Sequence, residues 1–224
     1  MSRAIGQMGL FSKRLILLLV LYLCADKGEA MGYGKPATCE SLECPAYEVV
    51  DQQKEFEVRS YKNAVWMSTS LINATSYKEA AGMGFNMLFA YIQGKNNQGL
   101  KINMTAPVRV DILPSTGPLY NSSFTVHFYV PQNYQNDPPL AENVHPEGWP
   151  KQHYAAVRRF GGFLNDSSIL IQASSLKKSL QGTPWESVVV TSDGGPSIYT
   201  VAGYNSPFES ENRVNEVMLL FDKF

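Results

Sequence analysis

The sequence predicts an α+β fold, in which a mainly antiparallel sheet carries two helices. Short runs rich in β-branched and aromatic residues recur along the 224-residue chain between turn residues, which is typical of strands. Two longer segments have apolar residues at helical spacing and capping residues at their starts. The order of these elements, ββαβ followed by ββαββ, indicates an internal duplication within one compact domain.

The first half contains the first predicted helix. Three strand-like runs precede it, at residues 47–50, 56–61 and 64–72. The helix is expected from Tyr77 to Gln93, because Ser76 and Glu79 form a capping box in which each side chain satisfies the other's backbone amide. Gly94 ends the helix, since glycine readily takes the left-handed conformation. A strand over residues 103–113 is expected to return against this helix.

The second half repeats the pattern. Its strand-like runs lie at residues 124–130, 153–160, 197–204 and 215–221. Asn165 or Asp166 can cap the second helix, and Gly182 with Pro184 ends it. Four apolar residues fall on one helical face, Ile169, Ala173, Leu176 and Leu180. The proline-rich segment 131–150 is predicted to be a surface loop.

The first helix is apolar nearly all round, unlike the second. Such a helix is usually buried on more than one side. Two interpretations remain open: the helix lies wholly in the core, or one face packs on the sheet while another lines an apolar pocket. Gly82 and Gly84 each cost a helix about 1 kcal/mol relative to alanine. They therefore indicate a close approach by a strand or a flat ligand.

Residues 1–30 have the pattern of a secretory signal peptide. A basic start is followed by an apolar run over residues 15–24, and Gly28 and Ala30 supply the small residues of a cleavage site. The apolar run is short for a membrane span, although an uncleaved signal anchor is the alternative. We expect a protein of the secretory pathway, extracellular or vacuolar, without a stable membrane span.

The N-terminal segment 31–46 contains the two cysteines that remain after removal of the signal peptide, Cys39 and Cys44. A close pair of cysteines in an oxidising compartment predicts a local disulfide, with two free thiols as the alternative. A structural zinc site is not expected, because it needs four ligands.

Four Asn-x-Ser/Thr triplets are possible glycosylation acceptors, since a glycan requires an exposed asparagine. Asn73 and Asn121 lie in turn-like polar stretches, and Asn165 begins the second helix. Asn103 falls in a predicted strand and is expected to remain unmodified.

Charge and motifs exclude several classes of function. The net charge is −1 at pH 7 and no basic cluster occurs, so no nucleic-acid partner is expected. The chain has no nucleophile elbow, no H-E-x-x-H and no C-x-x-C motif. Its three histidines, His127, His145 and His153, are not spaced as a metal pair. We therefore assign no catalytic or metal-binding residues and do not predict an enzyme.

Five ordered strings carry a family resemblance: YIQGKN with KINMTAPV, then TVHFYVP, AGYNSP and NEVMLL. Together they resemble the SOUL family of heme-binding proteins from about Tyr47 to Leu220, so the family domain is expected over residues 47–224. The likeness is to the SOUL type and, with the signal peptide and the cysteine pair, to the secreted plant branch. It implies a duplicated, distorted antiparallel β-barrel with two helices, and non-covalent binding of heme or a related tetrapyrrole.

The resemblance also implies a site, an open apolar groove between the first helix and the loop joining the last two strands. The residues that match these walls are Gly82, Phe85, Asn86 and Phe89 on the helix, and Phe208 and Arg213 in the loop. Phenylalanine rings can stack on a macrocycle. A guanidinium fits the geometry of a propionate carboxylate.

One departure from the family concerns the iron. Some members carry an axial histidine where this chain has Ser60, and Tyr61 and Met83 are the nearby alternatives. Heme iron is normally held by His, Cys, Met or Tyr. The resemblance thus implies heme binding without a strong axial side chain, so that iron-free porphyrins bind about as well as heme.

Three functions are compatible with the sequence. The first is a secreted carrier or scavenger of heme or porphyrin. The second is a tetrapyrrole-modifying enzyme, and the third is a secreted interaction module whose groove holds another apolar ligand. The long loop with Trp149 is the feature that would serve the third function. No protein partner is predicted.

Overall fold

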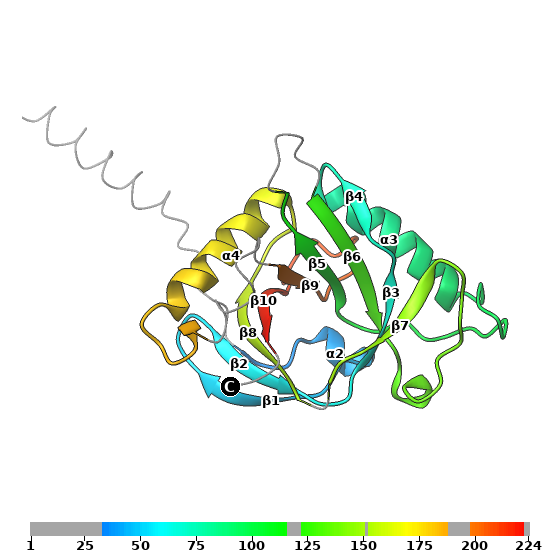
Figure 1. Cartoon of the computed structure of the whole chain (residues 1–224), viewed down its shortest axis with the longest axis horizontal. Coiled ribbons are helices and arrows are strands. Elements are labelled where there is room, and N and C mark those ends of the chain that lie inside the picture. Colours follow the sequence, from blue (N-terminus) through cyan, green and yellow to red (C-terminus); the bar gives the residue numbers. More distant parts are fainter. Residues whose placement is uncertain (1–32, 116–121, 151, 188–197, 222–224) are drawn as a thin grey trace, which may run out of the picture.

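The computed structural model describes residues 33–115, 122–150, 152–187 and 198–221. The predicted signal peptide and Asn121 lie outside these ranges. Figure 1 shows one curled sheet with helices on it, and the α+β class is confirmed. The elements are α2 (Thr38–Ser41), β1 (Tyr47–Gln52), β2 (Glu57–Tyr61), β3 (Val65–Thr69), β4 (Ile72–Ala74), α3 (Tyr77–Ile92), β5 (Val108–Leu113), β6 (Ser122–Tyr129), β7 (Val144–Gly148), β8 (His153–Phe160), α4 (Asp166–Leu180), β9 (Tyr199–Gly203) and β10 (Asn215–Phe221), with a 3₁₀ turn at Gln132–Tyr134.

The strand order reveals the duplication. The ten-stranded sheet runs β1-β2-β8-β10-β9-β5-β6-β3-β7, with β4 paired to β6. From β2 to β7 this order is symmetric about the β9–β5 pair, because β8, β10 and β9 mirror β3, β6 and β5. The first strand of each half pairs with a strand of the other half: β2 pairs with β8, and β7 pairs with β3. Apart from β1 and β4 in the first half, the repeat is therefore ββαββ in both halves.

This repeat corrects two predictions. β6 closes the first unit, whereas the sequence assigned residues 124–130 to the second. The second unit instead begins with β7, which lies in the segment predicted to be a loop. Its sequence, VHPEG, has one β-branched residue and a proline, and proline is tolerated mainly at sheet edges. In the described part of the chain, β7 pairs on one side only.

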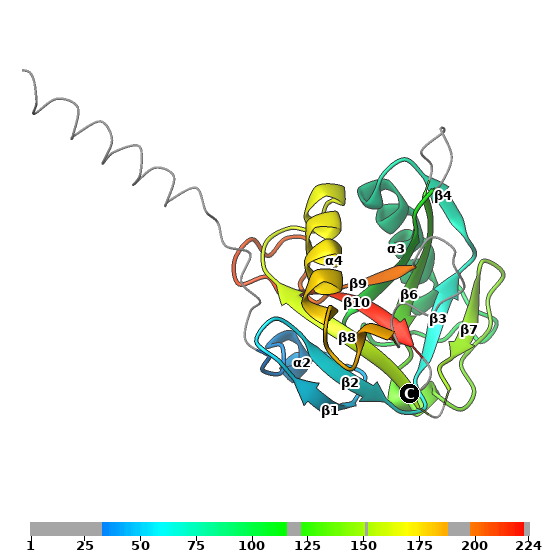
Figure 2. The ribbon, with the colours of Figure 1, turned by 60° about the vertical axis from the view of Figure 1, so that its left-hand side comes forward.

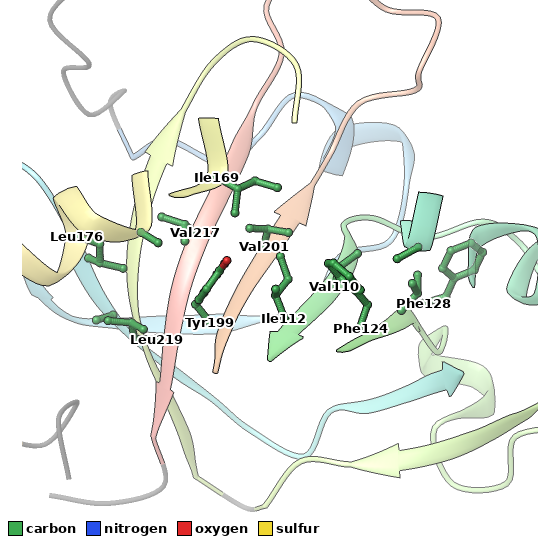
Figure 3. Packing of buried hydrophobic residues seen from close by; sticks show 14 of the residues in the cluster. Val110, Ile112, Phe124, Phe128, Ile169, Leu176, Tyr199, Val201, Val217 and Leu219 are labelled. Carbon is green, nitrogen blue, oxygen red and sulfur yellow. The ribbon is translucent and has the colours of Figure 1, made fainter. Parts of the chain in front are cut away.

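The two long helices pack against the same face of the sheet. α3 packs against β6, β4 and β3, and α4 packs against β10 and β8 (Figures 1 and 2). Figure 3 shows residues of the shared core, including Ile169 and Leu176 of α4, Val217 of β10, Val201 of β9, Val110 of β5 and Phe124 of β6. None of the helices in the described ranges has the length and apolar character needed to cross a membrane.

Helix α3 begins as predicted and has two different faces. Ser76 Oγ accepts a hydrogen bond from Glu79 N at 3.2 Å, as a capping box requires. The Glu79 carboxylate, however, accepts from Thr75 N at 3.2 Å and not from Ser76 N. Leu88 is buried towards the sheet, whereas Phe89 is 43% exposed. Of the two interpretations of this helix, the structure favours one face on the sheet and another open.

Helix α4 agrees closely with its prediction. Asn165 is the cap: its Oδ1 accepts from Ser168 N at 2.9 Å, and Ser168 Oγ accepts from Asn165 N at 3.1 Å. The predicted apolar face is the buried face. The helix ends at Leu180, and Gly182 has a φ of +73°.

The predicted strand at 103–113 is shorter than expected. Strand β5 begins at Val108, and Asn103 is exposed outside any strand. Residues just before β5 bond elsewhere: Thr105 Oγ1 donates to Tyr129 O at 2.7 Å, and Ala106 N donates to Glu43 O at 3.0 Å. The strand placement that argued against a glycan on Asn103 was therefore wrong.

Gly84 and Gly82 allow a matched test of the contact between α3 and the sheet. A Cβ on Gly84 would lie 2.3 Å from Val126 Cγ2, whereas a Cβ on Gly82 would meet nothing within 4 Å. Both Gly→Ala changes gain up to about 1 kcal/mol of helix propensity. Overpacking should cost Gly84→Ala about 1–3 kcal/mol more.

We expect urea denaturation to show Gly84→Ala less stable than Gly82→Ala by that difference. Equal stabilities of the two variants would contradict the close packing of α3 on β6.

Candidate functional site

A groove of about 1160 Å³ lies beside α3. Ligand pockets commonly measure about 300–1,000 Å³, so this groove is large enough for a broad, flat ligand. Its walls are α3, the loop between β9 and β10, and the N-terminal segment. Its lining residues are Ala37, Thr38, Ser41, Leu42, Tyr77, Lys78, Phe85, Phe89, Met104, Thr105, Ala106, Val108, Phe163, Leu164, Gly203, Tyr204, Asn205, Ser206, Pro207, Glu209, Glu211, Asn212 and Arg213.

The α3 wall is aromatic at its centre and cationic near its start. The rings of Phe85 and Phe89 are stacked, with centroids 5.6 Å apart and planes 13° apart. Phe85 is held in place by an edge contact to Phe128 of β6, with centroids 5.4 Å apart. Lys78, the second residue of the helix, is exposed and lies on the same side at helical spacing. This wall presents ring faces bordered by one positive charge.

The loop wall is stabilised by Arg213. Its side chain is 8% exposed, and Nη1 donates to Ser206 O at 2.8 Å and to the carbonyl of Glu209. The guanidinium also lies 4.5 Å from the ring centre of Phe163, a cation–π contact. Arg213 lines the groove and uses Nη1 to hold the loop, while its buried Nε has no hydrogen-bond partner among the described residues.

The six residues carried over from the family divide into two groups. Phe85, Phe89 and Arg213 line the groove, whereas Gly82, Asn86 and Phe208 are not among its lining residues. Phe208 is 95% exposed, because Arg213 turns the loop back on itself and leaves Phe208 on the outside. Gly82 lies between Lys78 and Phe85 in helical spacing, and having no side chain it leaves that part of the wall open.

Sequence reasoning missed Lys78, Met104 and the N-terminal residues of the groove. Lys78 could have been found, because it lies four residues before Gly82 and seven before Phe85, on one stripe of the helix. Met104 fell in a segment interpreted as a strand. No local signal identifies the N-terminal wall, since its place depends on contacts with distant strands.

The predicted alternatives for an axial ligand do not reach the groove. Ser60 is buried in β2, Tyr61 is buried near Glu216, and Met83 is 45% exposed outside the groove lining. The lining residues include no histidine or cysteine, and Met104 carries the one thioether among them. Burial raises the pKa of Tyr77, which keeps its hydroxyl protonated. The groove thus suits a macrocycle better than it suits iron.

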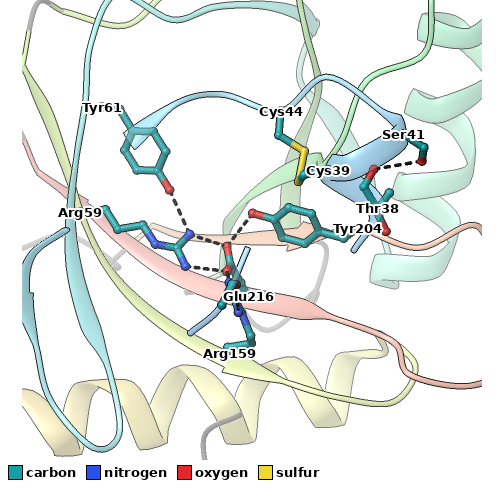
Figure 4. The surroundings of a disulfide bond; sticks show 10 residues. Thr38, Cys39, Ser41, Cys44, Arg59, Tyr61, Arg159, Tyr204 and Glu216 are labelled. Atoms are coloured by element: carbon teal, nitrogen blue, oxygen red, sulfur yellow. Dashed lines mark hydrogen bonds and ion pairs between the residues drawn. A yellow bond between two sulfur atoms is a disulfide. The ribbon is translucent and has the colours of Figure 1, made fainter. Parts of the chain in front are cut away.

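A buried ion-pair cluster lies behind the groove, shown in Figure 4. Glu216 of β10 accepts from Arg59 Nη2 at 2.7 Å through Oε1 and from Arg59 Nη1 at 2.8 Å through Oε2. Arg159 Nη2 donates to Oε1 at 2.8 Å, and the Tyr204 hydroxyl donates to Oε2 at 2.8 Å. Glu216 and Arg59 are fully buried, so the pair is shielded from solvent.

The cluster fixes the protonation of its members. Burial favours the neutral form of Glu216, but the charge of Arg59 and its hydrogen bonds outweigh burial and lower the pKa of the carboxyl. Burial and the nearby Glu216 charge raise the pKa of Tyr204 well above its usual value. Tyr204 is therefore a stable hydrogen-bond donor, and this fixes one residue of the groove wall.

The same cluster holds the N-terminal segment. Cys39 and Cys44 form the predicted disulfide, with an S–S distance of 2.06 Å, and Cys39 packs in a buried cluster with Tyr204. Arg159 also donates to the carbonyl of Gly34. The segment is thereby anchored to the face of the sheet that carries Glu216, and its residues Ala37, Thr38, Ser41 and Leu42 reach the groove.

A second polar cluster lies where β5, β6, β3 and β7 meet, apart from the groove lining. Asp111, His127 and Glu147 place possible metal-ligand atoms within 4.8 Å of one another. Arg109 Nη2 lies among them, 3.1 Å from Asp111 Oδ2 and 2.9 Å from Glu147 Oε1. The guanidinium already supplies the positive charge that these carboxylates need, so the cluster is an ion-pair network.

Ser68, His127 and Asp111 also match the composition of a catalytic triad. Ser68 Oγ lies 2.6 Å from His127 Nδ1, and His127 Nε2 lies 3.1 Å from Asp111 Oδ2. Ser68 is fully buried, at 0% exposure, so a substrate cannot reach its hydroxyl. We assign no catalytic role to these residues.

Comparison with known proteins gives a consistent result. The SOUL heme-binding protein family matches residues 42–220. Heme-binding protein 2 from Homo sapiens is 34% identical over 198 residues, covering 84% of this chain and 91% of that protein. Heme-binding protein 2 from Mus musculus is 32% identical, covering 85% and 91%. Heme-binding protein 1 from Xenopus laevis is 26% identical, covering 74% and 83%.

Among solved structures, the crystal structure of the EcmrR C-terminal domain has a TM-score of 0.49 at 7% identity. The superposition covers 80% of this chain and 99% of the EcmrR domain chain. This likeness is too weak to support a conclusion.

The Glu216 cluster can be tested by one isosteric change. Glu216→Gln removes the charge that two buried arginines face, and breaking such a pair costs about 3–5 kcal/mol. Glu48→Gln is the matched control, because Glu48 pairs with Lys62 at 2.7 Å with both side chains more than half exposed. An exposed pair contributes about 0–1 kcal/mol. Unfolding by guanidinium chloride measures both changes, and similar losses would contradict the structural role of Glu216.

Proposed function

Because the family match covers residues 42–220 and the human relative is 34% identical, this protein belongs to the SOUL heme-binding protein family, and we propose that it binds heme or a related tetrapyrrole non-covalently in the groove beside α3. The observation that carries this proposal is the stack of half-buried Phe85 and exposed Phe89 on the groove wall. Aromatic rings offset against a macrocycle add favourable contact beyond the area they bury. Heme is the ligand named for the family and its relatives.

Affinity in this groove rests on apolar contact and charge. Phe85, Phe89 and Val108 supply apolar surface, and Lys78 supplies a cation for a propionate group. Bound heme would place an iron atom in the groove, and Met104 is the lining residue that offers a thioether sulfur as a ligand. The remaining contacts do not depend on iron, so porphyrin and heme fit the same walls.

We further propose that the protein acts as a secreted carrier or scavenger, in the extracellular space or the vacuole. The signal-peptide pattern of residues 1–30 supports this role, as does the Cys39–Cys44 disulfide, since disulfides persist in oxidising compartments. Asn73 and Asn165 are exposed, as glycosylation requires. Neither an enzyme nor an interaction module gains support from a contact among the described residues.

The first test is a titration of the disulfide-bonded protein with heme and with protoporphyrin, followed by absorbance and porphyrin fluorescence. We expect saturable binding of both, with dissociation constants within about tenfold, because one strong coordinate bond would add more than the roughly 1.4 kcal/mol that tenfold represents. No saturable binding to either ligand would refute the proposed function. A large preference for heme would show that a side chain coordinates the iron strongly.

The second test concerns Lys78. Lys78→Gln should weaken the binding of protoporphyrin about two- to fivefold, the range expected for a partly exposed ion pair. The dimethyl ester of the same porphyrin, which lacks carboxylates, should bind both proteins equally. Lys177→Gln on the exposed face of α4 is the control, because Lys177 lies outside the groove lining. An equal effect of Lys78→Gln on both ligands would contradict the charge pairing.

A further inference from the structure

The N-terminal segment, residues 33–46, contributes to a groove that the family match only partly includes. The match begins at residue 42, whereas Ala37, Thr38 and Ser41 line the groove together with Leu42. Thr38 and Ser41 belong to α2, and Ala37 and Leu42 flank it on either side. Part of the candidate binding wall therefore lies outside the matched family domain.

Contacts on three sides keep this segment in one place. Tyr33 Oη donates to Val157 O of β8 at 3.3 Å. Glu43 O accepts from Ala106 N at 3.0 Å, and its carboxylate accepts from Gln132 N at 2.6 Å. These bonds span both halves of the sheet, so the segment is fixed in position relative to both.

The disulfide fixes the shape of the segment between these anchors. Cys39, 8% exposed, lies in the middle of α2, and its bond to Cys44 closes the chain just after the last groove-lining residue of the segment. Within α2, Ser41 Oγ donates to Thr38 O at 3.2 Å and Leu42 N donates to the same carbonyl at 2.9 Å. The groove-facing residues are therefore presented by a short, cross-linked turn.

We propose that this disulfide-bonded segment is a third wall of the tetrapyrrole site, and that Ala37, Thr38 and Ser41 contact the bound ligand. The proposal rests on the proposed function and extends its site beyond the helix and loop. Thr38 and Ser41 bring hydroxyls to a groove whose α3 wall is aromatic. The small side chains at positions 37 and 41 set how far a macrocycle extends towards α2.

The experiment narrows the groove by substituting tryptophan for small residues of this wall. Ala37→Trp and Ser41→Trp place a large ring at the groove, whereas Glu40→Trp places the same ring on an exposed α2 residue outside the groove lining. All three positions are exposed, so the fold accommodates each change. Protoporphyrin affinity is measured for each disulfide-bonded variant by porphyrin fluorescence, with circular dichroism as the check on folding.

We expect Ala37→Trp and Ser41→Trp to weaken binding at least about tenfold, because steric overpacking of a fitted contact commonly costs that much. Glu40→Trp should stay within about twofold of the unmodified protein, as surface substitutions away from a contact usually do. Equal affinities for all three variants, with the unmodified protein binding normally, would overturn this inference alone. Failure of the unmodified protein to bind would overturn the proposed function, and the inference with it.

A double variant tests the cross-link separately. Cys39→Ser with Cys44→Ser leaves the groove-lining residues unchanged but removes the bond that shapes the turn. We expect weaker porphyrin binding at unchanged secondary structure. Affinity equal to that of the disulfide-bonded protein would overturn the part assigned to the disulfide.

Discussion

The carboxylate of Glu216 is the interaction on which the arrangement of the groove depends. It lies on β10, near the middle of the sheet, and binds Arg59 of β2 and Arg159 of β8 at the same time. Through Tyr204 it fixes the loop wall, and through Arg159 it holds the N-terminal segment. A buried charge needs several well-placed partners, because an unpaired one costs several kcal/mol. One acidic residue thereby determines where two of the three groove walls stand.

The α3 wall depends on a different constraint, the close approach of α3 to β6. Gly84 allows the helix backbone to approach Val126, which brings Leu88 into the core. With its inner face tightly packed, the helix leaves Phe85 and Phe89 on the groove side. A helix that is apolar all round thus serves two surfaces at once. The glycine is needed by the sheet, and the aromatic residues remain available to a ligand.

Among the buried arginines of the described residues, Arg109, Arg59 and Arg213 have different surroundings. The guanidinium of Arg109 lies 4.8 and 4.9 Å from the ring centres of Trp66 and Trp149, and its charge is balanced by Asp111 and Glu147. Burial alone would raise the pKa of the Glu147 carboxyl, but its hydrogen bond to His127 and the Arg109 charge lower it to about 2. Arg59 is neutralised by Glu216, whereas Arg213 donates hydrogen bonds to loop carbonyls, which solvate its charge without neutralising it. Buried charge at Arg59 and Arg109 is therefore used for structure, and Lys78 is an exposed cation among the groove-lining residues.

The sequence by itself determined the elements whose signals are local. Helix α4 was predicted with its cap and its buried face, and β8 and β10 with their bounds, because periodicity and capping are encoded within a few residues. The family strings added the fold and the α3 wall. Tertiary structure alone decided that β7 is an edge strand, that Arg213 is turned inward and Phe208 outward, and that Ala37, Thr38, Ser41 and Leu42 line the groove. Each of these depends on contacts between residues far apart in the chain, and no local pattern of residues specifies such contacts.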